Sequence, residues 1–201
     1  MSTGTAATLM TAEEFYDWVH RPENANRWFE LVRGEVVELP PPTKRHGVVS
    51  ANIARILGNY TVAQGVGYVT SNDSGVILER SPDTVRGPDV ALYEDATSFE
   101  ELHPKYGEVP PRLAVEVLSP NDQAAQVLNK ITDYLTNGVE LVWLVNPDER
   151  KVTVHRPEKS PYRLTGDQEL TGDDVLPGFR CRVADFFFVP GGAEKPQSPA
   201  T

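Results

Sequence analysis

The strongest constraint on the fold is a strand–helix–strand pattern between residues 113 and 145. Residues 113–118 and 140–145 are short, nearly continuous apolar runs, as expected for strands that are covered on both faces. The segment between them repeats apolar residues at helical spacing. Two strands joined by a helix predict a βαβ unit, and therefore an α/β fold with a mixed sheet.

The segment after the first of these strands has the composition of a helix start. Ser119 is a good N-cap, Pro120 suits the first helical position, and Asp122 would face the positive end of the helix dipole. We therefore expect a helix from Ser119 to about Asn137, ended by Gly138. The inner face of this helix is expected to carry the apolar residues Ala124, Val127, Leu128, Ile131, Tyr134 and Leu135.

An N-terminal helix and hairpin precede this unit. Thr11 and Glu14 form a capping box that starts a helix, and Arg33-Gly34 is the expected turn of a hairpin ended by the proline run at residues 40–42. Further periodic segments predict a helix and then strands, with the helix at residues 46–64 and strands within 67–92 and 151–156.

The length of 201 residues fits one domain with a sizeable core better than two small domains. We assign this domain to residues 1–190 and expect a disordered tail at 191–201, which is rich in Pro, Gly, Ala and Ser. Cys181 is the only cysteine, which excludes an intramolecular disulfide and a four-cysteine zinc site. Without a signal peptide or a long apolar run, we expect a cytoplasmic protein with no membrane span.

The charge balance is acidic. The chain has 19 basic and 29 acidic residues, a net charge of −10. Domains that coat nucleic acid non-specifically are usually basic, so the charge argues against tight binding of that kind. It does not exclude a nuclease, because the carboxylates of a metal site add negative charge themselves.

Three polar residues stand in apolar surroundings. Asp89 opens an apolar strand, Glu116 lies in the middle of another, and Lys130 lies at the border of the buried helix face. A buried carboxylate costs several kcal/mol unless a cation pairs with it. If the two strands are neighbours, Asp89 and Glu116 can bind one Mg²⁺ or Mn²⁺, while Lys130 stabilises a phosphate. In simpler readings Asp89 caps a turn, Glu116 pairs with a structural cation, and Lys130 pairs with Asp133 at the surface.

The same residues carry a family resemblance. Pro88-Asp89, residues 116–120 and Lys130, together with residues 30–37 and 174–179, resemble the Uma-two family. This family is a branch of the PD-(D/E)XK restriction-endonuclease-like superfamily. The resemblance implies a restriction-endonuclease-like core, a mixed β-sheet flanked by helices, to which the N-terminal helix and hairpin are an extension.

The resemblance also implies a divalent-metal site. Asp89 matches the Pro-Asp carboxylate of the superfamily and Glu116 its second acidic position. The superfamily places a lysine two residues after that acid, where this chain has Leu118, so Lys130 would replace it from the following helix. Glu30 adds a fourth polar group to the catalytic set.

A group of cations is the expected contact for nucleic acid. Lys44, Arg45 and His46 stand together at a helix start, where positive charge opposes the helix dipole and favours an anionic partner. With Arg86 they are the predicted nucleic-acid-binding residues. A basic rim along the phosphate backbone is expected to comprise Lys44, Arg45, Arg80, Arg86 and Arg112.

The first functional hypothesis is a Mg²⁺- or Mn²⁺-dependent endonuclease that hydrolyses phosphodiester bonds. DNA is preferred over RNA as its substrate on the resemblance alone. The alternative is a non-catalytic module that retains the nuclease fold and binds nucleic acid or protein, which the acidic charge and the displaced lysine favour. A third hypothesis is hydrolysis of a small phosphodiester. Exposed strand edges are compatible with a homodimer, which the sequence does not demonstrate.

Overall fold

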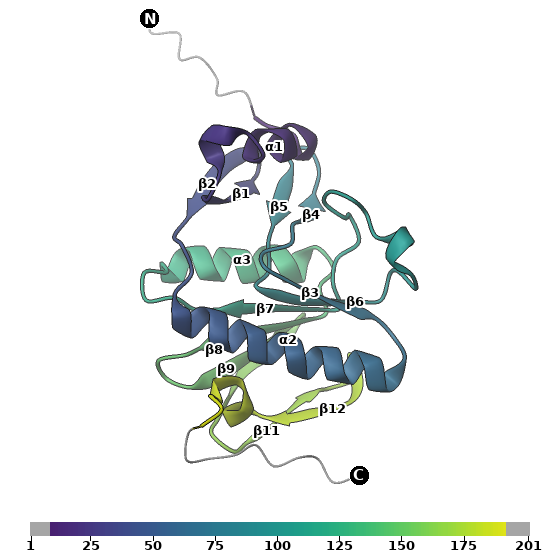
Figure 1. The fold of residues 1–201 in the computed structure, drawn as a ribbon, viewed down its shortest axis with the longest axis vertical. Coiled ribbons are helices and arrows are strands. Elements are labelled where there is room, and N and C mark those ends of the chain that lie inside the picture. Colours follow the sequence, from purple (N-terminus) through teal and green to yellow (C-terminus); the bar gives the residue numbers. More distant parts are fainter. Residues whose placement is uncertain (1–8, 192–201) are drawn as a thin grey trace, which may run out of the picture.

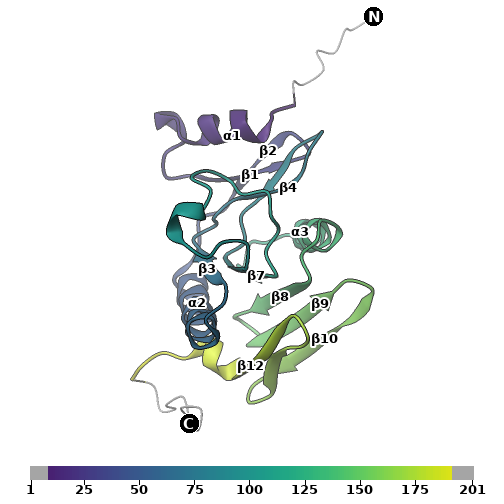
Figure 2. The same cartoon turned by 90° about the vertical axis from the view of Figure 1, so that its right-hand side faces the viewer.

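The structure is a computed structural model that describes residues 9–191. A six-stranded sheet lies at its centre, with α2 (Lys44–Gln64) on one face and α3 (Ala124–Thr136) on the other (Figure 1). Figure 2 shows the two helices on opposite sides of this sheet. In spatial order its strands are β10 (Lys159–Thr165), β9 (Lys151–Arg156), β8 (Leu141–Asn146), β7 (Leu113–Val117), β6 (Val90–Tyr93) and β3 (Tyr68–Ser71).

A four-stranded sheet lies at the N-terminal end of the molecule, and α1 (Ala12–Val19) packs on it (Figure 1). In spatial order its strands are β2 (Glu35–Leu39), β1 (Trp28–Val32), β5 (Thr84–Arg86) and β4 (Val76–Glu79). A separate C-terminal pair consists of β11 (Glu169–Gly172) and β12 (Leu176–Arg182). The short 3₁₀ helices are η1 (Pro22–Asn24), η2 (Phe99–Glu101) and η3 (Val183–Phe187).

The central βαβ unit is confirmed. β7 and β8 are parallel and α3 connects them, with Glu116 opposite Leu144. The other pairs in this sheet are antiparallel, so the sheet is mixed and the predicted fold class is confirmed. β6 pairs with β7 on the side away from β8. The strands that were expected to bring Asp89 and Glu116 together are therefore neighbours.

The two faces of the central sheet differ in polarity. Leu113, Val115 and Val117 of β7 join an apolar cluster with α2, in which Trp143 of β8 is fully buried. The intervening Ala114 joins a smaller cluster with α3. The α2 face is therefore an apolar core, whereas the α3 face also holds polar groups.

The predicted start of α3 at Ser119 is wrong. The helix begins after Gln123, and the Asp122 carboxylate instead accepts a hydrogen bond from the backbone N–H of Ser119 at 2.7 Å. Ser, Pro and Asp favour turns as strongly as helix starts, and here they form a turn before the helix. Leu128 was expected on the inner face but is 57% exposed, because it lies beyond the edge of the face that carries Tyr134.

The predictions for the N-terminal helix and hairpin agree with the structure more closely than the prediction for the start of α3. Thr11 and Glu14 form the capping box of α1. Arg33 and Gly34 form the hairpin turn, with φ values of 49° and 79°. α2 starts two residues earlier than predicted, after the N-cap Thr43. β5 was not predicted, because three residues are too few to show a periodic pattern.

Within residues 9–191, no helix combines the length and the apolar character needed to cross a bilayer. The tail predicted for residues 191–201 lies, apart from Gly191, outside the described residues.

Candidate active site

The candidate site lies where β6 begins and β7 ends. Asp89 immediately precedes β6, and Glu116 is the last residue but one of β7. Because Val90 pairs with Val115, the same register brings Asp89 beside Glu116. Both residues are buried, at 8% and 9% exposed. Two carboxylates predicted from separate parts of the sequence therefore meet at one point.

Asp89 is held from two sides. Its Oδ2 accepts a hydrogen bond from the backbone N–H of Val117 at 2.6 Å, and its Oδ1 lies 2.9 Å from Nε2 of His46 on α2. Burial would raise the pKa of Asp89, but His46 and Lys130 hold it below the ordinary value. Burial likewise opposes protonation of His46, yet Asp89 raises the pKa of the imidazole. His46 is thus tied to the carboxylate of Asp89.

Glu116 contacts two residues of α3. Its Oε2 lies 2.8 Å from Nζ of Lys130, and its Oε1 accepts a hydrogen bond from the hydroxyl of Tyr134 at 2.7 Å. Burial, reinforced by the charges of Asp89 and Glu30, raises the pKa of Glu116 to about 8 despite the nearby ammonium. The protonated form of this carboxyl group is therefore favoured first by burial and then by the neighbouring carboxylates.

Lys130 connects the two sheets. Its ammonium lies 2.9 Å from Oε1 of Glu30 on β1 and donates to the carbonyl of Gly87 at 3.1 Å, in addition to its contact with Glu116. Burial would lower the pKa of Lys130, but Glu116 and Glu30 raise it above the ordinary value, so the amine is charged. The expected reach of this helix lysine to the strand end is present in the structure.

Glu30 is more enclosed than the other carboxylates, at 2% exposed. Its Oε1 also accepts the backbone N–H of Gly87 at 2.9 Å, and its Oε2 pairs with Arg86 at 2.7 Å. Burial would raise the pKa of Glu30, but Lys130 and Arg86 lower it. The contacts of Glu30 orient Lys130, and they leave its Oε1 without a spare lone pair.

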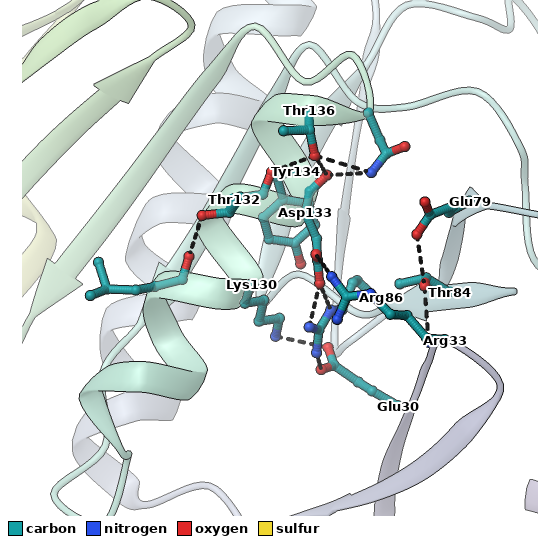
Figure 3. Close-up of polar contacts among 12 residues, drawn as sticks. Glu30, Arg33, Glu79, Thr84, Arg86, Lys130, Thr132, Asp133, Tyr134 and Thr136 are labelled. Carbon is teal, nitrogen blue, oxygen red and sulfur yellow. Dashed lines mark hydrogen bonds and ion pairs between the residues drawn. The ribbon is translucent and has the colours of Figure 1, made fainter. Parts of the chain in front are cut away.

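Arg86 lies between Glu30 and Asp133, as Figure 3 shows, with Lys130 on the adjacent turn of α3. Both Nε and Nη2 of Arg86 donate to Oδ2 of Asp133. Arg86 was expected to contact nucleic acid, but its side chain is buried, at 7% exposed, and pairs with these carboxylates instead. Asp133 therefore pairs with Arg86 rather than with Lys130.

Asp73 is a site residue that the sequence did not indicate. It lies in the turn between β3 and β4, with a positive φ of 54°, and its carboxyl group contacts that of Asp89. Burial and the charge of Asp89 raise the pKa of Asp73 to about 6. Its neighbours Asn72, Ser74 and Gly75 mark a turn but give no signal of chemistry.

The expected basic rim is largely neutralised. Arg45 pairs with Asp148 at 2.6 Å, and its neighbour Lys44 is exposed. Elsewhere in the rim, Arg80 pairs with Glu13, Asp83 and Glu108, and Arg112 pairs with Glu94 and Glu140. These arginines bind the acidic surface of their own chain.

A pocket of about 130 Å³ opens beside the carboxylates. Glu116, Lys130, His46 and Asp73 are among its lining residues. The hairpin of β1 and β2 and the loop before α3 contribute the rest of the lining. The buried cluster is therefore accessible to a small group.

The donor set fits a hard divalent cation. Asp89 and Glu116 supply carboxylate oxygens, which Mg²⁺ and Mn²⁺ prefer. Asp89 has polar contacts with His46, Val117 and Asp73, and Glu116 has two with Tyr134 and Lys130, so each carboxylate keeps a free lone pair. Burial, reinforced by the nearby carboxylates, raises the pKa of Glu116, and a bound cation would lower it. In residues 9–191, no three His, Cys, Asp or Glu side chains are already arranged as a ligand set. The fit therefore rests on two carboxylates, with water or substrate as further ligands.

A mixed sheet between two helices, with an acidic pair and a lysine at the joint of two strands, defines a restriction-endonuclease-like protein. The chain belongs to the Uma2 family, described as "Putative restriction endonuclease", whose model matches residues 12–184. The Uma-two resemblance is thus confirmed.

The fold is also that of a solved structure. It is similar to a "putative nuclease belonging to DUF820" from Anabaena variabilis, with a TM-score of 0.74 and 19% sequence identity. The match covers 89% of this chain and 97% of the other. No curated protein matches the sequence.

Proposed function

We propose that this protein is a Mg²⁺- or Mn²⁺-dependent nuclease that hydrolyses phosphodiester bonds, with DNA as the preferred substrate. The observation that carries the proposal is the convergence of Asp89, Glu116 and the charged amine of Lys130, because Asp89 and Glu116 are neighbours on paired strands and Glu116 and Lys130 both line one pocket. Membership of the Uma2 family supports it.

Asp89 and Glu116 are the residues that would hold the metal. When bound, such a metal lowers the pKa of a water molecule and offsets charge that builds on the phosphate. His46 and the N–H of Val117 fix the orientation of Asp89, so this carboxylate need not reorganise when a cation arrives. Tyr134 does the same for Glu116.

Lys130 supplies the positive charge at the phosphate. Its ammonium has three donors, which in this structure go to Glu116, Glu30 and the carbonyl of Gly87. Reorienting one donor toward a phosphate oxygen would stabilise the developing charge. Leu118, at the superfamily's lysine position, continues the β7 ladder through its N–H to Val145 and has no charged side chain, so Lys130 is the amine that contacts Glu116.

The test is a cleavage assay on single-stranded, double-stranded and branched DNA and on RNA, with Mg²⁺, Mn²⁺ or EDTA. Glu116→Gln and Lys130→Ala are expected to reduce metal-dependent cleavage by at least about 10²-fold. Glu100→Gln, at an exposed carboxylate in η2, is the matched control and should cleave normally. Cleavage that survives Glu116→Gln would exclude this site as its source.

One observation favours the alternative of a non-catalytic binding module. Lys130 already bridges Glu116 and Glu30, so the cluster is partly compensated by the chain's own charges. A folded wild type that binds Mn²⁺ in calorimetry but cleaves none of the substrates would support this alternative over the nuclease.

A further inference from the structure

The pocket has an apolar wall formed by the hairpin and the link that follows it. Trp28 of β1 and Leu39 of β2 are direct partners in the hairpin, so their side chains share one face. Pro40 and Pro42, in the link to α2, extend this wall. Trp28 is two residues before Glu30 and therefore on the same face of β1 as the catalytic cluster.

Trp28 is not explained by the core of the hairpin. The opposite face of β1 places Phe29 and Leu31 in the apolar cluster under α1, where Phe29 packs on Trp18. Trp28 is partly exposed and lies outside all three apolar clusters of residues 9–191. A large flat ring is thus presented to a hollow rather than to the protein interior.

Another part of the lining is polar, and its one acidic residue, Asp122, accepts a hydrogen bond from the backbone N–H of Ser119. This part includes the carboxamides of Asn121, Gln123 and Gln126, from the loop before α3 and its first turn. Within the described residues, none of these three carboxamides hydrogen-bonds to another part of the chain. Carboxamides can donate and accept at once, which is the pattern that base edges require.

The size of the pocket limits its occupant. Its volume of about 130 Å³ is well below the roughly 300–1,000 Å³ of ordinary small-molecule sites. A volume of this size suits one flat ring system with an aromatic side chain and carboxamides in its lining, whereas a stacked duplex is too large for it. The pocket is continuous with Glu116 and Lys130, so a ring bound there stays close to the proposed phosphate position.

The distribution of charged side chains also favours a single base over a duplex as the occupant of the pocket. Proteins that hold duplex DNA do so mainly through cations on the phosphate backbone. Here Arg45, Arg80 and Arg112 pair with acidic side chains, Arg86 is buried, and the net charge is −10. Recognition of a base by stacking needs fewer phosphate contacts.

We infer that this pocket binds one unstacked nucleobase of a single-stranded nucleic acid, with Trp28 as the stacking surface and the three carboxamides at the base edge. The inference rests on the proposed nuclease function, because it takes the phosphate attached to that nucleotide to lie at Asp89 and Glu116. It identifies the substrate class as single strands or unpaired ends rather than continuous duplex.

The test measures binding separately from cleavage. Fluorescence anisotropy in EDTA compares labelled single-stranded DNA, single-stranded RNA and duplex DNA on wild type, Trp28→Leu and Trp28→Phe. Wild type should prefer the single strands, Trp28→Leu should weaken this binding about tenfold or more, and Trp28→Phe should retain most of it. Phe99→Leu removes an aromatic ring that is 83% exposed and outside the pocket, and should bind as wild type. Thermal unfolding of each variant verifies folding.

The outcomes separate this inference from the proposed function. Equal affinity of Trp28→Leu and wild type, a preference for duplex, or no binding of any oligonucleotide by wild type would overturn the inference. Stacking-dependent binding without metal-dependent cleavage would keep the inference and overturn the nuclease. Comparison of the affinities for single-stranded DNA, single-stranded RNA and a dinucleotide shows whether the bound base comes from DNA, from RNA or from a short fragment.

Discussion

The two faces of the central sheet are built from the same strands and have opposite characters. Toward α2, β7 directs Leu113, Val115 and Val117 into a wholly apolar cluster. Toward α3, it directs Glu116 into a network that contains the ammonium of Lys130 and the hydroxyl of Tyr134. Because neighbouring residues of one strand serve the two faces, one face can hold the sheet while the other holds buried charge.

This difference indicates that the apolar α2 face supplies the stability that offsets the free-energy cost of burying charges on the α3 face. Buried charges are destabilising unless each is paired and hydrogen-bonded, and such networks rarely add net stability over an apolar core. Burial of apolar side chains stabilises by about 25 cal/mol per Å². We therefore expect substitutions on the α2 face to change stability and those on the α3 face to change chemistry as well.

The largest expected effect is on the α2 face. Trp143 is fully buried, with ring centroids 5.4 Å from Phe179 and 6.0 Å from Phe186. Trp143→Ala should lower the free energy of unfolding by about 4 kcal/mol through the cavity it leaves. Urea denaturation measures this loss, and Phe99→Ala at an exposed ring is the control. A loss below about 1 kcal/mol would show that the α2 face does not hold the sheet.

A smaller loss is expected from the charged network on the other face. Glu30→Gln removes the buried carboxylate that Arg86 and Lys130 share and leaves them only Asp133 and Glu116, so it should lower the free energy of unfolding by about 3 kcal/mol at neutral pH. Urea denaturation at several pH values measures it. Glu38→Gln, whose exposed carboxylate pairs with Arg27 on the same hairpin, is the matched control and should change stability little.

The pH dependence of this loss has a definite sign. The pKa of Glu30 in the folded protein lies below its ordinary value of 4.5. The stability that depends on ionised Glu30 is therefore complete above pH 4.5 and is lost as the pH falls through the lower, folded pKa. The difference between wild type and Glu30→Gln should narrow in acid. A difference that widens in acid would contradict the network drawn here.

Much of the fold could be predicted because its signals are local. The capping box of Thr11 and Glu14, the Arg33-Gly34 turn and the apolar strands of the βαβ unit each act within a few residues. The start of α3 could not, because Ser119 to Asp122 suit a turn and a helix equally and only the packing of α3 decides between them.

The site residues likewise fall into those that a local sequence pattern indicates and those that depend on tertiary packing. Glu116 and Asp89 stand out because a charge inside an apolar strand is unusual, and the order of strands then brings them together. Asp73 comes from a turn of ordinary composition, and the partners of Arg86 lie on β1 and α3. Contacts of this kind depend on how the two sheets and α3 pack, which no local pattern encodes.

The smallest expected effect on the free energy of unfolding is at Tyr134, whose ring packs in the α3 cluster and whose hydroxyl contacts Glu116. Tyr134 is fully buried with the α3 cluster, and its hydroxyl donates to Glu116. Tyr134→Phe keeps the ring and removes this donor, so the free energy of unfolding should fall by about 1 kcal/mol. The lost donor favoured the ionised carboxyl, so the pKa of Glu116 should rise above the value of about 8. Carboxyl ¹³C NMR of the metal-free protein measures this shift, and Thr136→Val, which removes a hydroxyl bonded only to α3 and its C-cap Asn137, is the control. A pKa of Glu116 that stays fixed in Tyr134→Phe would mean that the hydroxyl contributes packing alone, and that the polar network on the α3 face ends at Lys130.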